Sequence, residues 1–243
     1  AQAMRAARSI VALTGAGIST PSGIPDFRST GSGLWTRDDP MKVSSLSSFQ
    51  QHPERFFNWL RPLVRQIMAA EPNPAHQALA ALEASGWLQG VITQNIDMLH
   101  QRAGSCKVIE MHGSLRQAVC THCRKTQPLE VYGPLLLEQE EIPRCPDCGW
   151  ILKPDIVLFG EVLPIQAMEA AQTLCENADL ILVAGTALEV APVNQLPFVA
   201  LEKGATLIIN TLSSTPLDGF ADILIPYDVA RTLPALGQAL SRS

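Results

Sequence analysis

Long hydrophobic runs are missing from this 243-residue sequence. Its long uncharged stretches, such as residues 9–25 and 190–201, are interrupted by Gly, Pro, Asn or Gln, so neither of these supplies the ~20 continuous apolar residues that span a membrane. Charge is also sparse, since 17% of the residues are Asp, Glu, Lys or Arg and the net charge is −5. Such a balance gives no general attraction to nucleic acid or to an anionic membrane. The sequence predicts a globular protein with no membrane and no direct nucleic-acid partner.

A secretory signal is not expected either. The first residues carry two arginines but pass directly into an apolar, β-branched run, which argues against a cleavable signal peptide. The length corresponds to one large or two modest domains. We expect a cytoplasmic protein whose oligomeric state is open, with a monomer compatible with the composition.

Cysteines are few, but four of the six form two pairs, Cys120-x-x-Cys123 and Cys145-x-x-Cys148, with 21 residues between the pairs. In a reducing compartment this pattern favours metal thiolates over disulfides. Four thiolates fill a tetrahedral Zn²⁺ and leave no open position, so the predicted zinc is structural and not catalytic. The alternative, a redox dithiol, needs one pair at a helix start beside a strand.

Apolar β-branched runs alternate with helical patterns along the chain. Near-continuous hydrophobic strands of this kind predict an α/β fold with a Rossmann-like parallel sheet covered on both faces. The runs are residues 9–14, 90–93, 107–111, 155–158, 180–184, 205–210 and 222–225. Several end in polar or Gly-rich clusters, namely GAGIST, TQNID, HGS and GTAL. Because ligands bind at the carboxyl ends of parallel strands, we expect these clusters to converge on one crevice.

Two stretches interrupt this alternation and predict a smaller domain made of a helical insertion, 29–86, and a zinc-binding insertion, 115–151. The larger domain then comprises residues 1–28, 87–114 and 152–243. Within the first insertion, residues 53–70 carry a helical apolar stripe that Pro62 should kink or divide. A second helix, 74–85, has Asn73 as its N-cap and Gly86 as its stop. The second insertion shows little apolar period.

The glycine-rich loop, Gly15 to Thr20, resembles the start of a dinucleotide fingerprint, in which glycine lets backbone amides approach a pyrophosphate. Thr20 stands where the third fingerprint glycine would be, and the acidic Asp38 and Asp39 lie in a loop and not after a second strand. A hydride-transferring Rossmann enzyme is therefore disfavoured.

Further motifs occur in order after this loop. The stretch GAGISTPSGIPDFR is followed by TQNID, HG, the four cysteines, KPDIVLFGE and GTALEVAP. Together they resemble the sirtuins, NAD-dependent protein lysine deacylases, of bacterial type, over residues 10–229. The resemblance implies a transferase that uses NAD as co-substrate to remove acetyl or other neutral acyl groups from protein lysines, giving nicotinamide and O-acyl-ADP-ribose.

The resemblance also implies site residues. NAD would lie between the two domains, with the pyrophosphate on the glycine turn, a lid over the nicotinamide ribose, and the adenosine at the far end. The implied NAD contacts are Gly15, Ala16, Gly17, Ser19, Asp26, Phe27, Arg28, Gln94, Asn95, Ile96, Asp97, Gly185, Thr186, Ala187, Asn210, Asp228 and Val229.

His112 would be the general base, and Asn95 the second catalytic residue, ordering the ribose and a water. Chemistry supports the first role, because a ribose hydroxyl must lose a proton and an imidazole with a pKa near neutrality accepts it. The acyl-lysine peptide would add as a strand along KPDIVLFGE, with contacts from Val157, Phe159, Gly160 and Val190.

Three positions depart from the family pattern: Ala187 replaces a common Ser, Met98 a common Gly and Thr211 a common Glu. We expect them to tune NAD affinity and not to abolish it. Two alternatives stay open, namely ADP-ribosyl transfer to proteins on the same fold and a non-catalytic NAD sensor. For His112 alone, a structural role is the alternative. His76 is interpreted as a packed or capping residue, and His100 is assigned no partner.

Overall fold

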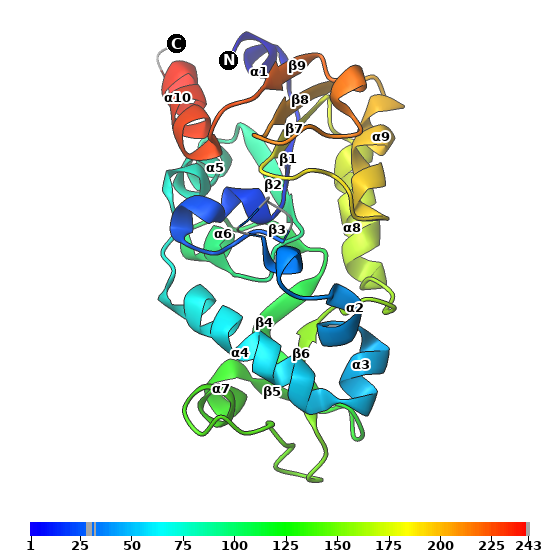
Figure 1. Cartoon of the computed structure of the whole chain (residues 1–243). Helices are drawn as coiled ribbons and strands as arrows, with labels where there is room; N and C mark the ends of the chain where they lie inside the picture. Colours follow the sequence, from blue (N-terminus) through cyan, green and yellow to red (C-terminus); the bar gives the residue numbers. More distant parts are fainter. Residues whose placement is uncertain (28–30, 32, 242–243) are drawn as a thin grey trace.

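Two sheets of different kinds organise the protein, whose computed structural model describes residues 1–27, 31 and 33–241 (Figure 1). The larger sheet has six parallel strands in the order β3-β2-β1-β7-β8-β9. They are β1 Ile10–Thr14, β2 Leu88–Thr93, β3 Val108–Glu110, β7 Leu180–Ala184, β8 Thr206–Asn210 and β9 Ile223–Ile225. The order reverses between β1 and β7, and such a reversal is where open parallel sheets bind ligands. The predicted Rossmann-like α/β architecture is confirmed.

Helices cover both faces of this sheet, because successive residues of a strand point to opposite faces. In β1, Ile10 and Ala12 pack into one apolar cluster, whereas Val11 and Leu13 pack into another. The first cluster is closed by α1 Gln2–Ala6, α5 Pro74–Ala84 and α10 Val229–Ser241, and the second by α8 Ile165–Glu176 and α9 Leu196–Leu201. Figure 1 shows α5 and α10 on one side of the strands and α8 and α9 on the other.

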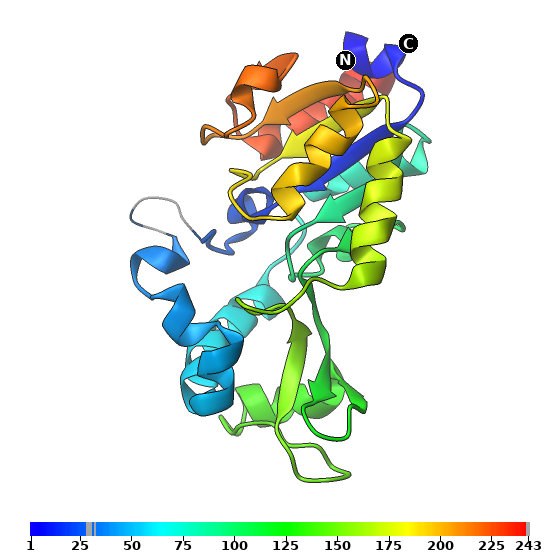
Figure 2. The same cartoon turned by 90° about the vertical axis from the view of Figure 1, so that its right-hand side faces the viewer.

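The smaller sheet is antiparallel, in the order β5-β4-β6, and lies below the first one in both views (Figures 1 and 2). Its strands are β4 Gly113–Cys120, β5 Thr126–Pro128 and β6 Leu152–Ile156. It shares one apolar cluster with α4 Pro53–Ala69 and α7 Leu129–Leu137, which contains Phe56, Leu115 and Tyr132. Helices α2 Pro40–Val43 and α3 Leu46–Gln51 pack beside α4.

One expectation for this region is wrong. The strand expected in the parallel sheet at residues 155–158 ends instead at Ile156 and pairs antiparallel with β4. Its apolar run is explained by burial against the smaller core and not by a place in the parallel sheet. The second insertion contains β5, α7 and most of β4. Elements this short give only a weak periodic pattern of apolar residues in the sequence.

The two helices predicted in the first insertion both form. Helix α4 runs through Pro62 as one element of 17 residues, with the proline on its exposed side, so it is not divided. Helix α5 starts as predicted, since the Asn73 side chain accepts the amide of Ala75, and Gly86 follows it with a φ of +78°. However, α5 packs on the parallel sheet with α10. The limits of the two domains stay a prediction. Two elements pack differently from it, since α5 lies on the parallel sheet and β6 pairs with β4 in the smaller sheet.

Short elements complete the chain. They are α6 Leu99–Arg102 and the 3₁₀ turns Ala16–Ile18, Thr20–Ser22, Leu34–Thr36, Val193–Gln195 and Asp218–Phe220. Within the described part of the chain, no helix has both the length and the hydropathy that a membrane crossing requires.

Candidate active site

A cleft of about 1000 Å³ opens at the carboxyl ends of β1, β2 and β7, between the two sheets. This volume lies at the upper end of the range for small-molecule sites. The polar clusters expected to converge do so, since Ala16, Asn95, His112 and Thr186 all line the cleft. Residues of α4 and the turn after β6 form the facing wall.

The turn after β1 lies very close to the loop after β7. A Cβ on Gly17 would lie 2.8 Å from the carbonyl oxygen of Gly185, and one on Gly15 would lie 2.7 Å from Cβ of Thr186. Glycine is therefore required at both positions for steric reasons. Among the described residues, no acceptor pairs with the amide hydrogens of Ala16 and Gly17. Two adjacent free amides at the wall of a cleft can bind an anionic phosphate.

Gln94 and Asn95 follow β2 and are held by their side chains. Nε2 of Gln94 donates to Oγ1 of Thr186 at 3.0 Å. Nδ2 of Asn95 donates to the carbonyl oxygen of Gly15 and to Oγ of Ser19, both at 3.1 Å. These bonds fix the orientation of the Asn95 amide, and its Oδ1 is left as the available acceptor at the cleft.

His112 joins β3 to β4, and its Nδ1 lies 2.8 Å from the carbonyl oxygen of Gln94. A carbonyl can only accept, so Nδ1 carries the proton and Nε2 keeps its lone pair. Burial lowers the pKa of His112 below its ordinary value, and the bond to Gln94 opposes this effect. The imidazole is therefore neutral at pH 7, with Nε2 able to accept a proton.

A buried polar cluster lies beside the cleft. Oγ of Ser19 donates to Oδ2 of Asp97 at 2.6 Å, and Nε2 of His76 lies 3.4 Å from the same hydroxyl. The rings of His76 and His100 meet edge to face with centroids 4.9 Å apart, and Nε2 of His100 lies 2.9 Å from Oγ1 of Thr14. Burial is the largest cause that lowers the pKa of His76 to about 4 and that of His100 to about 3. Both rings are neutral at pH 7.

Of the two histidines in this cluster, the sequence predicts the role of His76 but not that of His100. His76 is fully buried and its Nδ1 accepts the amide of Asn73 in a capping box, so its predicted packing and capping role is confirmed. The partners of His100 are not apparent from the sequence, because Thr14 and His76 are distant from it along the chain and no spacing rule connects them.

Aromatic rings form one wall of the cleft. Phe27 stacks on Trp35 with centroids 5.1 Å apart, and Trp35 stacks on Trp59 at 5.6 Å. Phe159 meets Trp35 edge-on at 6.1 Å. All four rings line the cleft, which makes this wall apolar and poor at holding stray water.

The turn after β6 has a defined pattern of used and free backbone groups. The amide of Val157 donates to the carbonyl oxygen of His112 at 2.9 Å, and the amide of Phe159 donates to that of Ser44 at 3.0 Å. Among the described residues, nothing pairs with the carbonyl oxygen of Val157 or with the amide of Gly160. These two groups are free to bond an extended peptide, and both residues line the cleft.

Val190 also lines the cleft, but its loop forms no strand, and its carbonyl oxygen accepts the amide of Asn194 at 3.1 Å. The carbonyl oxygen of Val190 is therefore already bonded within the protein.

Twelve of the implied NAD contacts line the cleft. Gly15 is not among the lining residues, although it directly precedes Ala16 and Gly17, which are, and four further residues lie elsewhere or are not described. Asn210 is fully buried, and its amide group donates to the carbonyl oxygens of Ile225 and Tyr227. Asp228 accepts the amide of Ala230 at the start of α10, and Val229 packs in the core. Arg28 lies outside the described residues. The roles of these residues stay predictions.

The cleft also contains residues that the sequence does not single out for a role there. Ser213 and Ser214 follow β8 and line it. Thr211, which the sequence singles out as a departure expected to tune NAD affinity, lines the cleft next to them. The rule that ligands bind at strand ends could have found these two serines. Met168, Glu169 and Gln172 line the far side from α8, where no strand-end signal exists.

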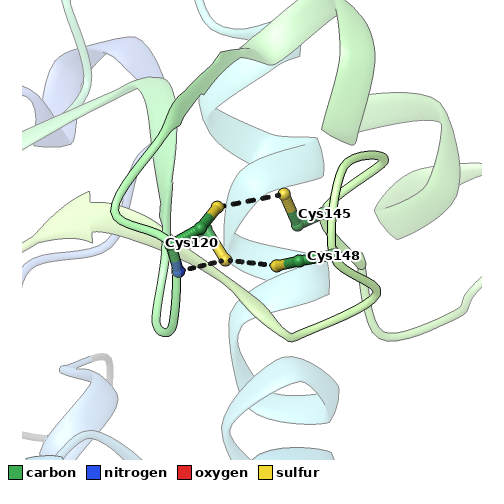
Figure 3. Close-up of side chains that lie close together, drawn as sticks. Cys120, Cys145 and Cys148 are labelled. Atoms are coloured by element: carbon green, nitrogen blue, oxygen red, sulfur yellow. Dashed lines mark hydrogen bonds between the residues drawn. The ribbon is translucent and has the colours of Figure 1, made fainter.

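The four paired cysteines meet where β4 ends at Cys120, and none of them is among the residues that line the cleft. Figure 3 shows Cys120, Cys145 and Cys148 close together. The four Sγ atoms all lie within 4.8 Å of one another, with Cys120 3.4 Å from Cys148 and Cys123 3.7 Å from Cys145. A tetrahedral Zn²⁺ with Zn–S bonds of about 2.3 Å places its sulfurs about 3.8 Å apart. The donor set and its spacing therefore fit a structural zinc, as predicted.

This fold and site define an α/β enzyme with a nucleotide-sized cleft, a neutral histidine at its wall and a separate thiolate cluster. Comparison with known proteins gives the family. The Sir2 family model matches residues 15–192, which is more than half of the chain. The chain belongs to the Sir2 family, as the motifs predict.

Relatives and solved structures agree with this assignment. An NAD-dependent protein deacetylase 1 of Pyrobaculum aerophilum is 46% identical over 93% of this chain and 87% of its own length. An NAD-dependent protein deacylase of Thermococcus kodakarensis is 40% identical over 97% and 92%. A solved Sir2 enzyme has a TM-score of 0.94 at 40% identity, covering 99% of this chain and 96% of its own. A Sir2 complex with a p53 peptide and NAD⁺ has a TM-score of 0.90 at 40% identity, covering 100% and 97%.

Proposed function

We propose that the protein removes acetyl or other uncharged acyl groups from protein lysine side chains, with NAD as co-substrate, giving nicotinamide and O-acyl-ADP-ribose. The observation that carries the proposal is the neutral His112 in the cleft that Asn95 also lines. Its Nδ1 is held by Gln94, and its Nε2 has no hydrogen-bond partner among the described residues. NAD supplies the ADP-ribose group that accepts the acyl group.

The cleft has groups suited to hold NAD. The free amides of Ala16 and Gly17, with the hydroxyl of Thr186, are placed to bind the pyrophosphate. Oδ1 of Asn95 can accept a ribose hydroxyl or orient a water, since both its amide hydrogens are used within the protein. We assign Ile96 and Asp97 to the carboxamide, and Asp26 and Phe27, with Arg28, to the lid.

His112 acts as the general base in this proposal. Its Nε2 takes the proton of a ribose hydroxyl, which converts a weak nucleophile into a competent one. The Gln94 carbonyl oxygen stabilises the ring once it becomes charged, because Nδ1–H already donates to it at 2.8 Å. Phe27 and Phe159 exclude water, so that the acyl oxygen and not water attacks the ribose.

The acyl-lysine peptide binds as an added strand. The free carbonyl oxygen of Val157 and the free amide of Gly160 would bond its backbone or the lysine amide. Phe159 and Val190 would flank the lysine stem.

Uncharged acyl groups are favoured by the charges around the cleft. Among its described lining residues there is no Lys or Arg, whereas Asp26, Asp97, Glu161, Glu169 and Glu189 are acidic. A carboxylate on the acyl chain would be repelled by these acidic side chains. We therefore propose acetyl and longer neutral acyl groups as substrates.

We further propose a larger NAD-binding domain and a smaller zinc and helical domain on either side of the cleft. Zn²⁺ would be held by the four paired cysteines and would stabilise the smaller sheet without taking part in the reaction. Thiolate ligation suits a reducing compartment, so we propose the cytoplasm as the location.

The test is mass spectrometry of an acetyl-lysine peptide incubated with the protein, with and without NAD. We expect the peptide to lose its acetyl group only when NAD is present. Nicotinamide and acetyl-ADP-ribose should form in the same amount. His112→Ala should abolish the loss while the fold and zinc content stay unchanged, and His52→Ala, a change at a half-exposed histidine outside the cleft, should have no effect. Consumption of NAD with an unmodified peptide would indicate ADP-ribosyl transfer or hydrolysis instead, and full activity of His112→Ala would refute the base.

A further inference from the structure

An ion pair lies directly behind the turn that follows β6. Nζ of Lys153 lies 2.8 Å from Oε2 of Glu161, and their side chains are 15% and 24% exposed. Nζ also donates to the carbonyl oxygen of Ile156 at 2.6 Å. The pair therefore ties the start of the KPDIVLFGE segment to its end. The reaction proposed above does not use either side chain.

The same carboxylate closes the turn itself. Oε2 of Glu161 accepts the amide of Leu158 at 2.8 Å, while the Glu161 amide donates to the carbonyl oxygen of Leu158 at 2.9 Å. Gly160, inside this turn, has a φ of +86°, as the third residue of a type II turn requires. Both backbone groups of Leu158 are thus occupied by Glu161, and this inner side of the turn is closed.

The opposite side of the turn is held by its neighbours. The amide of Leu46 donates to the carbonyl oxygen of Phe159 at 2.9 Å, and the Phe159 amide donates to Ser44. Between these two sets of bonds, the groups left for a ligand are the Val157 carbonyl oxygen and the backbone of Gly160. Glu161 accordingly limits which backbone groups a peptide can reach.

We propose that Lys153 and Glu161 are a positioning pair that holds the peptide-binding turn in its bound shape before the acyl-lysine peptide arrives. The inference rests on the proposed function, because it deepens the account of how that substrate is bound. A loop that is already ordered loses less conformational entropy on binding, so affinity for the peptide rises. A charge-assisted bond between Glu161 and the Leu158 amide is well suited to this task, since it is stronger than a neutral one.

The test compares Glu161→Ala, Glu161→Gln and Lys153→Met with the wild-type chain. Losing hydrogen bonds to a charged group should raise KM for an acetyl-lysine peptide about tenfold in Glu161→Ala and in Lys153→Met. Glu161→Gln should change KM less, because its amide oxygen can still accept the Leu158 amide. KM for NAD and zinc content should stay near the wild-type values in all three variants.

A second readout needs no turnover. Hydrogen exchange at residues 157–161 should be faster in Glu161→Ala, and the dissociation constant of a labelled acetyl-lysine peptide should rise by the same factor as KM. Glu71→Ala, which removes the exposed pair with Arg102 outside the cleft, is the control and should change neither.

The outcomes separate the two proposals. A wild-type chain that binds the peptide without removing its acyl group contradicts the proposed function, while the dissociation constants still decide the role of the pair. Unchanged peptide affinity in Glu161→Ala would overturn the positioning role. An equal loss of peptide affinity, NAD affinity and thermal stability would also overturn it, because it would show a general structural contribution.

Discussion

At the scale of single residues, the site depends on which atoms are already bonded. His112 is useful because one nitrogen is committed to Gln94, and Asn95 because its amide hydrogens are committed to Gly15 and Ser19. What remains for a substrate, among the contacts of the described residues, is the lone pair of His112 Nε2 and the acceptor oxygen Oδ1 of Asn95. The wider polar cluster of Ser19 and Asp97 holds Asn95 in this orientation.

The first prediction concerns the pH dependence of deacylation. Because burial lowers the pKa of His112, its Nε2 stays unprotonated at neutral pH, and kcat/KM should fall as the pH drops through a value below the ordinary 6.5. A profile of kcat/KM against pH from 5 to 8 measures this. An acid limb centred above 6.5 would contradict a histidine with a lowered pKa.

The second prediction concerns Ala187, which lines the cleft beside Thr186. Ala187→Ser restores a hydroxyl that can donate to the cofactor phosphates, and one net hydrogen bond of about 0.5–1.5 kcal/mol should tighten NAD binding about two- to tenfold. Isothermal titration with NAD checks this. Ala167→Ser, on α8 outside the cleft, is the control. Weaker binding in Ala187→Ser would show that the methyl group is needed for packing.

At the scale of elements, α5 and α6 meet beneath the glycine turn through His76 and His100. The unfolded chain binds a proton on each histidine below about pH 6.5, while the folded chain holds both neutral until about pH 4 and pH 3. Stability is therefore complete above pH 6.5 and is lost as the pH falls toward those lower values.

This loss is the third prediction. The free energy of unfolding should drop by about 1.4 kcal/mol per pH unit for each histidine below pH 6.5. Urea unfolding at several pH values measures the slope. His100→Leu also removes a buried Nδ1 that has no hydrogen-bond partner within the described part of the chain. This variant should reduce the slope by about 1.4 kcal/mol per pH unit, the contribution of one histidine. An unchanged slope in this variant would exclude His100 as a source.

The elements also show which parts of the fold can be predicted from the sequence. The parallel strands and the caps of α5 follow from local rules, because β-branched runs and the Asn73 cap act within a few residues. The placement of β6 in the smaller sheet could not be predicted, since an apolar strand has the same sequence pattern in a parallel and in an antiparallel sheet. Contacts such as His100 with Thr14 depend on packing between distant segments. The motifs, by contrast, are local, and they indicate Asn95 and His112 correctly as residues of the cleft.

At the scale of the whole molecule, separate cores support the two sides of the cleft. The smaller sheet, α4 and α7 share one apolar cluster, while the parallel sheet and its helices build two others. The smaller core includes the buried ligands Cys120 and Cys145, so metal and packing stabilise the same region.

The fourth prediction follows from this division. Cys145→Ser should lose its zinc and unfold the smaller sheet at lower temperature, because metal binding energy is also folding energy for such a site. Metal analysis with calorimetry should find less than one zinc per chain and an earlier transition, while the parallel sheet melts near its usual temperature. A metal-free variant of wild-type stability would refute a structural zinc.

Strand β4 connects the two ends of this smaller region, with Cys120 as its last residue and His112 directly before its first. None of the four cysteines is among the residues that line the cleft, so the metal site is separate from the proton-accepting nitrogen. The cluster could therefore serve as a spectroscopic probe. Co²⁺ in place of Zn²⁺ would give the smaller sheet a visible colour that fades when it unfolds, while deacylation continues at the rate of the zinc protein.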